Sequence, residues 1–387
     1  MEFSQSHLIG CAPPAKVRCG SLRDWPLRAR CHKLEEGGPI NVRLEDVAKR
    51  AKVSISTVSR VVNHTNTVSG ATRRRVLAAL EELNYTPNLQ ARLLVSGQSN
   101  LLGIVVSNLE NPFFVDLFHR LESYAARAGY ELILANTNYE PSRLAETLRM
   151  MRGRCVTGIA IAASETLPRE ASELLAAKTR VICVNTNEAL SGLSHIRVDA
   201  RSGMRKLVGH LASLGHRRLA YLRHERTYTG GTDERRVTFE ETCHANEIEY
   251  VHVPMPARES WEDGRNAMRK LSSIGFDASG IVCVNDMTAL SVLRALRDHG
   301  LRCPEQVSVT GFDNILIAHL SCPSLTTASI ASDSIAAMIF KTLTAEPGAV
   351  GTDSTFEPEL IVRESTGPYN DCGFLSAKRE RANSFEK

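Results

Sequence analysis

Residues 42–88 read VRLEDVAKRAKVSISTVSRVVNHTNTVSGATRRRVLAALEELNYTPN, and the apolar positions at their start follow a helical repeat. These positions are Leu44, Val47, Ala48 and Ala51. The spacing i, i+3, i+4, i+7 predicts a short helix with one apolar face. After a break at Lys52 and Val53, the hydroxyl of Ser54 can cap a second short helix that ends at Val62.

A third helix is predicted to begin at Ser69 or Thr72 and to be stopped by Pro87. Its apolar face is expected to consist of Val76, Leu77, Leu80 and Leu83. Two helices of two turns cannot bury enough apolar area by themselves. The third helix would complete a small core, and this arrangement is the helix-turn-helix unit.

The second of these helices has the side chains expected of a helix that reads DNA. One side is rich in Ser and Thr, and Arg60 lies near its end. A helix fits the major groove of B-DNA, which is about 12 Å wide, and Arg can bridge O6 and N7 of guanine. Residues 41–99 contain nine basic and four acidic residues, a net charge of +5 where the whole chain has +4. An ordinary three-helix bundle would leave both the hydroxyl-rich face and this charge unexplained.

From Leu101 onward, short apolar runs alternate with amphipathic stretches. The runs include LLGIVV (101–106), ELILAN (131–136), GIAIAA (158–163), RVICVN (180–185), RLAYL (218–222), GIVCVN (280–285) and VSVTGF (307–312). This alternation predicts parallel strands covered by helices on both faces. About ten strands are too many for one compact sheet of this kind. We therefore expect two doubly wound subdomains, with a ligand cleft at the carboxyl ends of their strands.

The composition excludes several classes of protein. The chain of 387 residues is 43% hydrophobic and 23% charged, as is usual for a globular protein. It contains neither an apolar run of about 18 residues nor a basic start followed by an apolar segment, so we expect no membrane span and no signal peptide. Its ten cysteines form no CxxC pair or metal-ligand cluster, which favours reduced thiols in a cytoplasmic protein. Cys155, Cys183 and Cys283 lie in or beside apolar runs and are expected in the core.

The stretches DVAKRAKVSISTVSRVVN and VSGATRRRVLAALEELNYTPN resemble the DNA-binding signature of the LacI/GalR (lactose-repressor/galactose-repressor) family. The resemblance extends to ARLL at 91–94, NPFF at 111–114, LGHRRLAYL at 214–222, VNDMTAL at 284–290 and VSVTGFDN at 307–314. It implies a lambda-repressor-like helix-turn-helix domain, a periplasmic-binding-protein-like sensor domain and a homodimer.

The resemblance assigns roles to residues of the DNA-binding segment. It implies that Ile55 and Ser56 choose the operator and that Arg60 contacts a base. It places Ser54, Thr57 and Ser59 at positions that touch phosphate or base, and Asn63 at the end of the helix. Ala91 and Leu94 fall in the hinge helix, where Leu94 matches a leucine that wedges into the minor groove and bends the duplex. Without the resemblance, residues 88–96 would be interpreted as a plain linker.

The resemblance also implies an effector site. Phe113 and Phe114 are placed on the cleft wall of the first subdomain, and Arg235, Asn285 and Asp313 on the second. Carboxylate, amide and guanidinium groups beside an aromatic floor suit a small polyhydroxyl ligand. Two positions depart from the family pattern: Thr238 stands where the family usually has Gly, and Trp261 lies two residues from the usual cleft aromatic.

The sequence thus predicts a repressor with five segments: a disordered extension (1–40), a helix-turn-helix domain (41–86), a hinge helix and linker (87–99), an effector-binding and dimerisation domain (100–366) and a tail (367–387). The expected partners are a pseudo-palindromic DNA operator, a carbohydrate-like effector and a second copy of the chain. We expect a dimer because the tail contains no leucine heptad. No catalytic motif, metal cluster or cofactor motif is found, so an enzyme is not expected. A transcriptional activator remains an alternative. A solute-binding protein is a weaker one, because it would have no use for residues 41–99.

Overall fold

The structure is a computed structural model, and it describes residues 42–62, 68–85, 99–177, 179–186, 193–225, 233–256, 260, 262–346 and 353–371. The chain divides into two compact units: an N-terminal unit, residues 1–95, and a C-terminal unit, residues 96–387.

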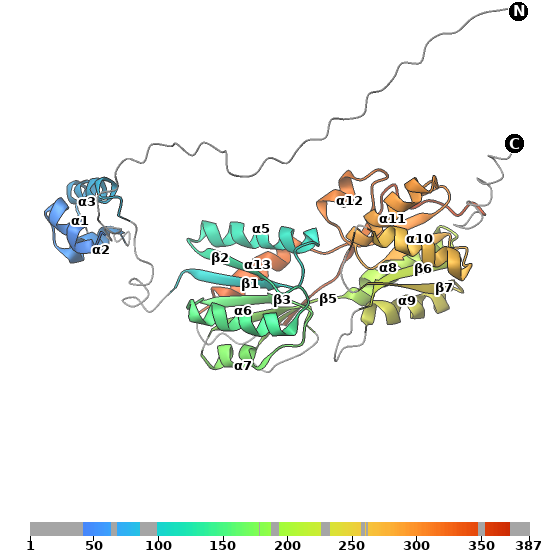
Figure 1. The fold of residues 1–387 in the computed structure, drawn as a ribbon, viewed down its shortest axis with the longest axis horizontal. Coiled ribbons are helices and arrows are strands. Elements are labelled where there is room, and N and C mark those ends of the chain that lie inside the picture. Colours follow the sequence, from blue (N-terminus) through green and yellow to red (C-terminus); the bar gives the residue numbers. More distant parts are fainter. Residues whose placement is uncertain are drawn as a thin grey trace, which may run out of the picture. The chain divides into compact units, whose positions relative to one another are not determined.

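The described part of the N-terminal unit contains three helices, drawn in blue in Figure 1: α1 Leu44–Ala51, α2 Ile55–Val62 and α3 Gly70–Glu82. Each contributes a fully buried valine to one small core, namely Val47, Val58 and Val76. Hydroxyl side chains begin two of the helices. Ser54 accepts a hydrogen bond from the backbone N–H of Thr57, and Ser69 accepts one from that of Thr72. The three predicted helices are therefore present, with the expected caps.

Two details predicted for the third helix are wrong. Leu77 is 49% exposed, because it lies about 100° around the helix from Val76, while Ala79 is buried in its place. The helix ends at Glu82, well before Pro87. Asn84 adopts a left-handed backbone (φ 48°), and the N–H of Tyr85 returns to the carbonyl of Leu80. This is a Schellman motif, which satisfies the last carbonyl groups without a proline.

The C-terminal unit contains two six-stranded sheets. The first sheet has the order β11-β5-β4-β3-β1-β2 and is parallel throughout. Its strands are β1 Leu101–Val106, β2 Glu131–Asn136, β3 Gly158–Ala162, β4 Arg180–Val184, β5 Ser194–Val198 and β11 Asp353–Phe356. It is packed with α5 Pro112–Arg127, α6 Pro141–Gly153, α7 Arg169–Ala176 and α13 Ser332–Leu343. We call this half the first subdomain.

The second sheet has the order β12-β10-β9-β8-β6-β7 and belongs to the second subdomain. Its strands are β6 Arg218–His224, β7 Glu249–Met255, β8 Gly280–Cys283, β9 Ser308–Asp313, β10 Thr326–Ser329 and β12 Glu359–Ile361. Only the pairing of β10 with β12 is antiparallel. The helices of this half are α8 Ala200–Ser213, α9 Glu234–Ala245, α10 Asp263–Ile274, α11 Asp286–Asp298 and α12 Leu316–Leu320.

The chain passes between the two subdomains three times, after β5, after β10 and after β11 (Figure 1). Each subdomain therefore contains elements from distant parts of the sequence, as when α13 packs against α5. The prediction of two doubly wound subdomains is confirmed. No helix within the described ranges is long and apolar enough to cross a membrane.

The structure corrects one prediction about the cysteines and adds a detail to the predicted tail. Cys183 and Cys283 are buried as expected, but Cys155 is exposed, because it lies in the turn after α6 with a left-handed backbone (φ 54°). The tail predicted from Gly367 is packed for its first residues. The carbonyl of Gly367 lies 3.1 Å from Nε2 of the buried His216, and Tyr369 donates its backbone N–H to Leu214.

The close approach of α10 and α11 gives a stability prediction. A Cβ atom on Gly264 would collide with the backbone carbonyl of Ser291, whereas one on Gly209 in α8 would meet nothing within 4 Å. Gly264→Ala should therefore lower the free energy of unfolding by about 3 kcal/mol. Gly209→Ala is the control and should raise it by up to about 1 kcal/mol through helix propensity. Urea unfolding measures both, and equal values would show that the helices can move apart freely.

Candidate functional sites

The first candidate site is the exposed face of α2. At its start, three hydroxyl groups are linked: Ser54 Oγ lies 2.9 Å from Ser56 Oγ and 2.8 Å from Thr57 Oγ1. Val58 and Val61 on the opposite face are buried. The polar face of this helix is thus directed away from the core of its own unit.

Two further side chains of α2 extend outward with the hydroxyls. Ile55 is 47% exposed although it is apolar, and Arg60 is exposed. An exposed isoleucine among hydroxyls can contact the methyl group of thymine, and an arginine can contact guanine. Ser59 is half-buried on the same helix. The predicted residues Asn63, Ala91 and Leu94 lie outside the described residues.

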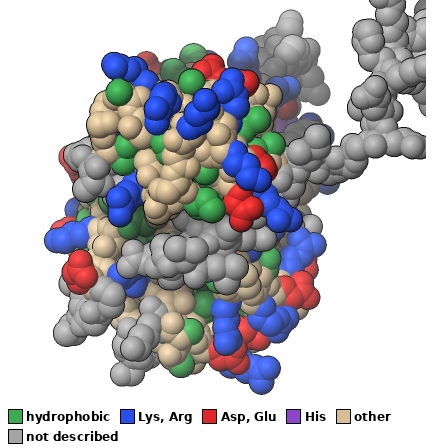
Figure 2. Space-filling view, turned by 90° about the vertical axis from the view of Figure 1, so that its left-hand side faces the viewer, with side chains coloured by type: hydrophobic (Ala, Val, Ile, Leu, Met, Phe, Trp, Pro, Cys, Tyr) green, Lys and Arg blue, Asp and Glu red, His purple; other side chains and the backbone are tan. Residues whose placement is uncertain are grey.

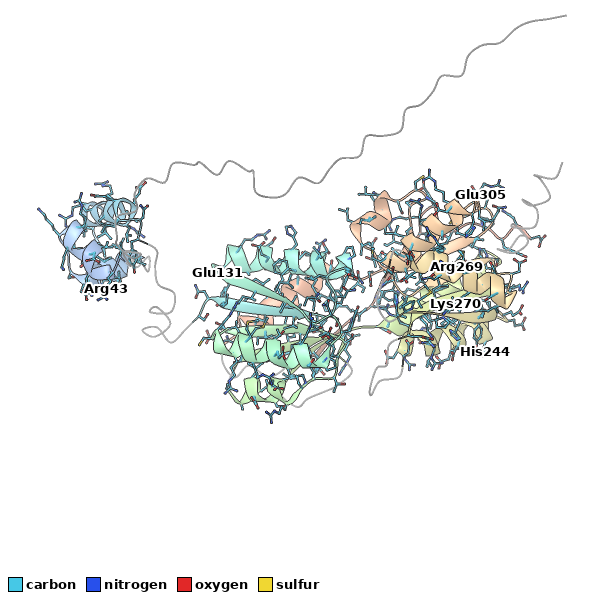
Figure 3. The ribbon with its side chains drawn as sticks, viewed as in Figure 1. Arg43, Glu131, His244, Arg269, Lys270 and Glu305 are labelled. Atoms are coloured by element: carbon cyan, nitrogen blue, oxygen red, sulfur yellow. The ribbon has the colours of Figure 1, made fainter. Side chains whose placement is uncertain are left out.

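The charge of this unit is only partly compensated within it. Arg50 on α1 pairs with Glu82 on α3, with 3.0 Å between Arg50 Nε and Glu82 Oε1. At the start of α1, Arg43 (labelled in Figure 3) donates its backbone N–H to the carboxylate of Asp46 in a capping arrangement. Figure 2 shows blue Lys and Arg side chains at the surface together with red Asp and Glu side chains. The net charge of +5 over residues 41–99 is suited to a polyanion.

The second candidate site is a cavity of about 410 Å³ in the C-terminal unit. It is lined from both subdomains, so we call it the cleft. All five residues expected at the effector site line it: Phe113, Phe114, Arg235, Asn285 and Asp313. Its volume suits a molecule the size of a monosaccharide or nucleoside.

The cleft is bridged by a hydrogen bond between the subdomains. Asn111 caps α5, accepting the backbone N–H of Phe113 on its Oδ1 at 3.0 Å. Its Nδ2 donates to Oδ2 of Asp313 at 3.3 Å. Both side chains are buried. Asn111 therefore orients the aromatic start of α5 and, at the same time, binds the carboxylate of the opposite wall.

Phe113 and Phe114 form the aromatic part of the first wall. Their rings make an edge-to-face contact with 5.4 Å between centroids. Phe113 is 7% exposed and packs into the core, while Phe114 is half-buried. Phe114 therefore has the larger surface available to a ligand.

Arg235 and Asn285 are held by the second subdomain. The guanidinium of Arg235 donates to the carbonyl of Val284 at 2.6 Å and stacks 3.9 Å from the ring centroid of Phe312. Asn285 caps α11, accepting the N–H of Thr288 at 2.9 Å. Thr238, which replaces the family's usual glycine, is buried on α9, and Trp261 lies outside the described residues.

The sequence prediction did not include several residues that line the cleft, among them Tyr139, Arg197, Arg223 and His224. His224 is buried between the carbonyl of Pro256 (2.7 Å from Nδ1) and the hydroxyl of Thr288 (3.2 Å from Nε2). Arg197, Arg223 and His224 lie at the carboxyl ends of β5 and β6. Taking every residue at a strand's carboxyl end as a candidate would have found them.

Behind Asp313, a second carboxylate is completely buried. Asp286 accepts the hydroxyl of Thr327 at 2.6 Å and the backbone N–H of Ile315 at 2.9 Å. It thereby fixes the loop after β9, where Asp313 (φ 115°) and Asn314 (φ 59°) have unusual backbone angles. Burial, and next the negative charge of Asp313, raise the pKa of Asp286 from 3.8 to about 8.

The raised pKa of Asp286 predicts a pH dependence. Between the ordinary pKa and about 8, the folded state holds a proton that the unfolded state has lost. The free energy of unfolding should therefore fall as the pH rises from 5.5 to 7.5, by up to about 1.4 kcal/mol per unit from this group. Asp286→Asn cannot titrate and should lose this contribution.

The measurement is urea unfolding at three pH values for both proteins. The difference between them removes the effect of histidines such as His216, whose pKa is lowered by burial and whose contribution has the opposite sign. Asp298→Asn, on the exposed surface of α11, is the control and should keep the wild-type slope. Parallel slopes for wild type and Asp286→Asn would contradict the assignment.

A unit with an exposed polar helix, joined to a unit with a cleft between two doubly wound subdomains, defines a DNA-binding regulator with a sensor domain. Residues 43–88 match the family model "Bacterial regulatory proteins, lacI family", and residues 208–366 match "Periplasmic binding protein-like domain". The chain is 30% identical to the HTH-type transcriptional repressor PurR of Pasteurella multocida, over 83% of this chain and 98% of the relative. The chain belongs to the lacI family, and the predicted family and fold are confirmed.

Two solved structures show the likeness in three dimensions. The lac repressor dimer bound to operator and the anti-inducer ONPF has a TM-score of 0.72 at 25% identity, over 84% of this chain and 99% of that one. A periplasmic binding protein/LacI transcriptional regulator from Alkaliphilus metalliredigens, complexed with D-xylulofuranose, has a TM-score of 0.61 at 28% identity. That match covers 69% of this chain and 99% of the other.

Proposed function

We propose that this regulator is a repressor that binds a pseudo-palindromic operator as a homodimer and releases or tightens it when a carbohydrate-like effector enters the cleft. The observation that carries the proposal is the combination, in one chain, of the exposed polar face of α2 with a cleft bridged by Asn111 and Asp313. The relatives named above are regulators, and we assign the cleft a binding role and no catalytic one. Because the partner is DNA, we place its action in the cytoplasm, at the nucleoid.

In this proposal, α2 lies in the major groove. Arg60 contacts guanine, Ile55 contacts a thymine methyl, and Ser56 reaches a base edge. Ser54, Thr57 and Ser59 supply contacts to phosphate or base, and Asn63 closes the helix. The segment with Ala91 and Leu94 folds as a hinge helix on DNA, where Leu94 enters the minor groove and bends the duplex.

Effector binding is transmitted to the DNA-binding unit by a change in the relative orientation of the two subdomains. Phe113, Phe114, Arg235, Asn285 and Asp313 contact the effector, so ligand groups compete with the bond from Asn111 to Asp313. Three chain connections allow the subdomains to rotate as rigid bodies. The rotation changes the distance between paired hinge segments, and operator affinity changes with it.

For the second copy of the chain, we propose α12 as part of the contact surface. Its side chains Leu316, Ile317 and Leu320 are 75%, 47% and 69% exposed. Three exposed large apolar residues on five consecutive positions are costly in a monomer and typical of a protein interface. We place α12 at the two-fold axis of the dimer, where the helix meets its own copy and the patch is self-complementary.

The double variant Leu316→Glu/Leu320→Glu should shift the protein from dimer to monomer at micromolar concentration, because four like charges would meet across the two-fold axis. Sedimentation velocity measures the change. Ile274→Glu is the control, since Ile274 is 50% exposed on α10 and should leave the dimer intact. A tetramer in the wild type, or a dimer that survives the double substitution, would contradict this assignment.

Arg60→Ala tests the DNA-reading role. At an operator selected from random duplexes, it should cost roughly 1–3 kcal/mol and relax the preference at one base pair. Arg75, which is exposed on α3, provides the control. Arg75→Ala should either weaken binding to the selected and the scrambled duplex equally or leave both affinities unchanged. Titrations of both duplexes at one salt concentration give the comparison. If Arg60→Ala weakened both equally, Arg60 would serve phosphate.

A further inference from the structure

Three arginines line the cleft among the residues that the structure describes, and they differ in how far their charge is compensated. Arg197 has Asp353 at 3.8 Å, an ion pair in which both side chains are half exposed or more. Arg235 donates to the neutral carbonyl of Val284 and has the ring of Phe312 beneath it. At 3.8 Å the carboxylate of Asp353 makes no two-pronged hydrogen bond with Arg197, and the carbonyl of Val284 offers Arg235 a single acceptor.

Arg223, at the end of β6, is the one of these arginines whose charge is least compensated. Its side chain is half-buried, and its Nε is shielded from solvent without a hydrogen-bond acceptor. Within the described part of the chain, Arg223 has neither a carboxylate at ion-pair distance nor a side-chain hydrogen bond. Arginine cannot shed its proton to reduce the cost of burial.

The carboxylates that line the cleft, in contrast, already have donors from the protein. Asp313 accepts from Asn111. Asp233 caps α9 by accepting the N–H of Arg236 at 3.2 Å. Glu234 lies 3.8 Å from Arg201. The unused hydrogen-bonding capacity of the cleft is therefore mainly that of cationic donors, which a ligand must match with acceptors.

We propose that the effector carries an oxyanion, a carboxylate or a phosphate group, and that Arg223 binds it with help from Arg235. The inference rests on the proposed function, since it assumes that the cleft binds the effector. A hydroxyl group could accept one hydrogen bond from Arg223 but would leave its charge uncompensated, whereas an oxyanion accepts two parallel bonds and neutralises the charge. The remaining polar groups of the cleft, such as Asp313, would bind the hydroxyl groups of a sugar acid or a sugar phosphate.

Inorganic phosphate is the first probe. In the full-length protein, sodium phosphate should raise the midpoint of thermal unfolding in a saturable way, at an ionic strength held constant with chloride. Arg223→Met should lose the effect, and Arg223→Lys should retain a weaker one, because Lys keeps the charge without the planar fork. Arg269→Met, on α10 (labelled in Figure 3) and outside the lining of the cleft, is the control and should respond as the wild type does.

The source of the oxyanion is identified with matched ligands. Glucose, gluconate and glucose 6-phosphate, and likewise ribose and ribose 5-phosphate, are titrated calorimetrically. The anionic member of a set should bind at least roughly tenfold more tightly than the neutral one, and Arg223→Met should remove that advantage. Gluconate and glucose 6-phosphate distinguish a carboxylate from a phosphate.

In the phosphate titration, two results would overturn the proposal: no saturable phosphate response in the wild type, or a response that persists in Arg223→Met. Neither result would affect the proposed function, which fails separately if the protein selects no operator from random DNA. Equal affinity of the wild type for the neutral and the anionic members of both ligand sets would likewise retain the sensor and exclude the oxyanion. Arg223→Lys keeps the test decisive if the methionine variant does not fold.

Discussion

The hydrogen bond between Asn111 and Asp313 is the constraint on which the organisation of the sensor unit depends, because it joins the two subdomains across the cleft. Further contacts hold both of these residues in place. Asn111 is held as the cap of α5, and Asp313 by the loop that Asp286 anchors. A buried polar bond of this kind is costly to leave unmade. A ligand that displaces Asn111 from Asp313 must therefore satisfy both groups or separate the walls.

The helices and strands could largely be predicted from the sequence, because their pattern reflects burial. The i, i+3, i+4, i+7 spacing identified α1, and apolar runs bounded by polar residues identified strands such as β1 and β9. The prediction failed where an apolar residue lay just outside the stripe, as Leu77 did, and where a local motif ended a helix, as at Asn84. Hydrophobicity alone carries no information on either.

The candidate site was less predictable, because side chains meet there from distant parts of the sequence. Phe113 and Asp313 were found through the family resemblance, and Asp313 also because it stands at the end of an apolar strand. Arg223 and His224 were missed, since a cation after a strand is usually solvated, and only the geometry shows that both line the cleft. The complete burial of Asp286 was equally hidden, because Asp at the start of a helix is ordinarily an exposed residue favoured by the helix dipole.

The loop from Asp313 to Leu316 connects three features within four residues. Asp313 lines the cleft, the backbone of Ile315 is bound to Asp286, and Leu316 begins the exposed apolar helix proposed as the dimer surface. The carboxylate of Asp286 fixes the middle of this loop. A ligand that moves Asp313 must therefore also strain the hydrogen bond between Ile315 and Asp286. A displacement at the cleft would then be passed to α12 over three residues, and in a dimer it would reach both copies through one surface. An oxyanion bound to Arg223 would contribute binding energy on the same subdomain as Asp313. This energy would come from compensating the charge of Arg223, and it would be available for the displacement.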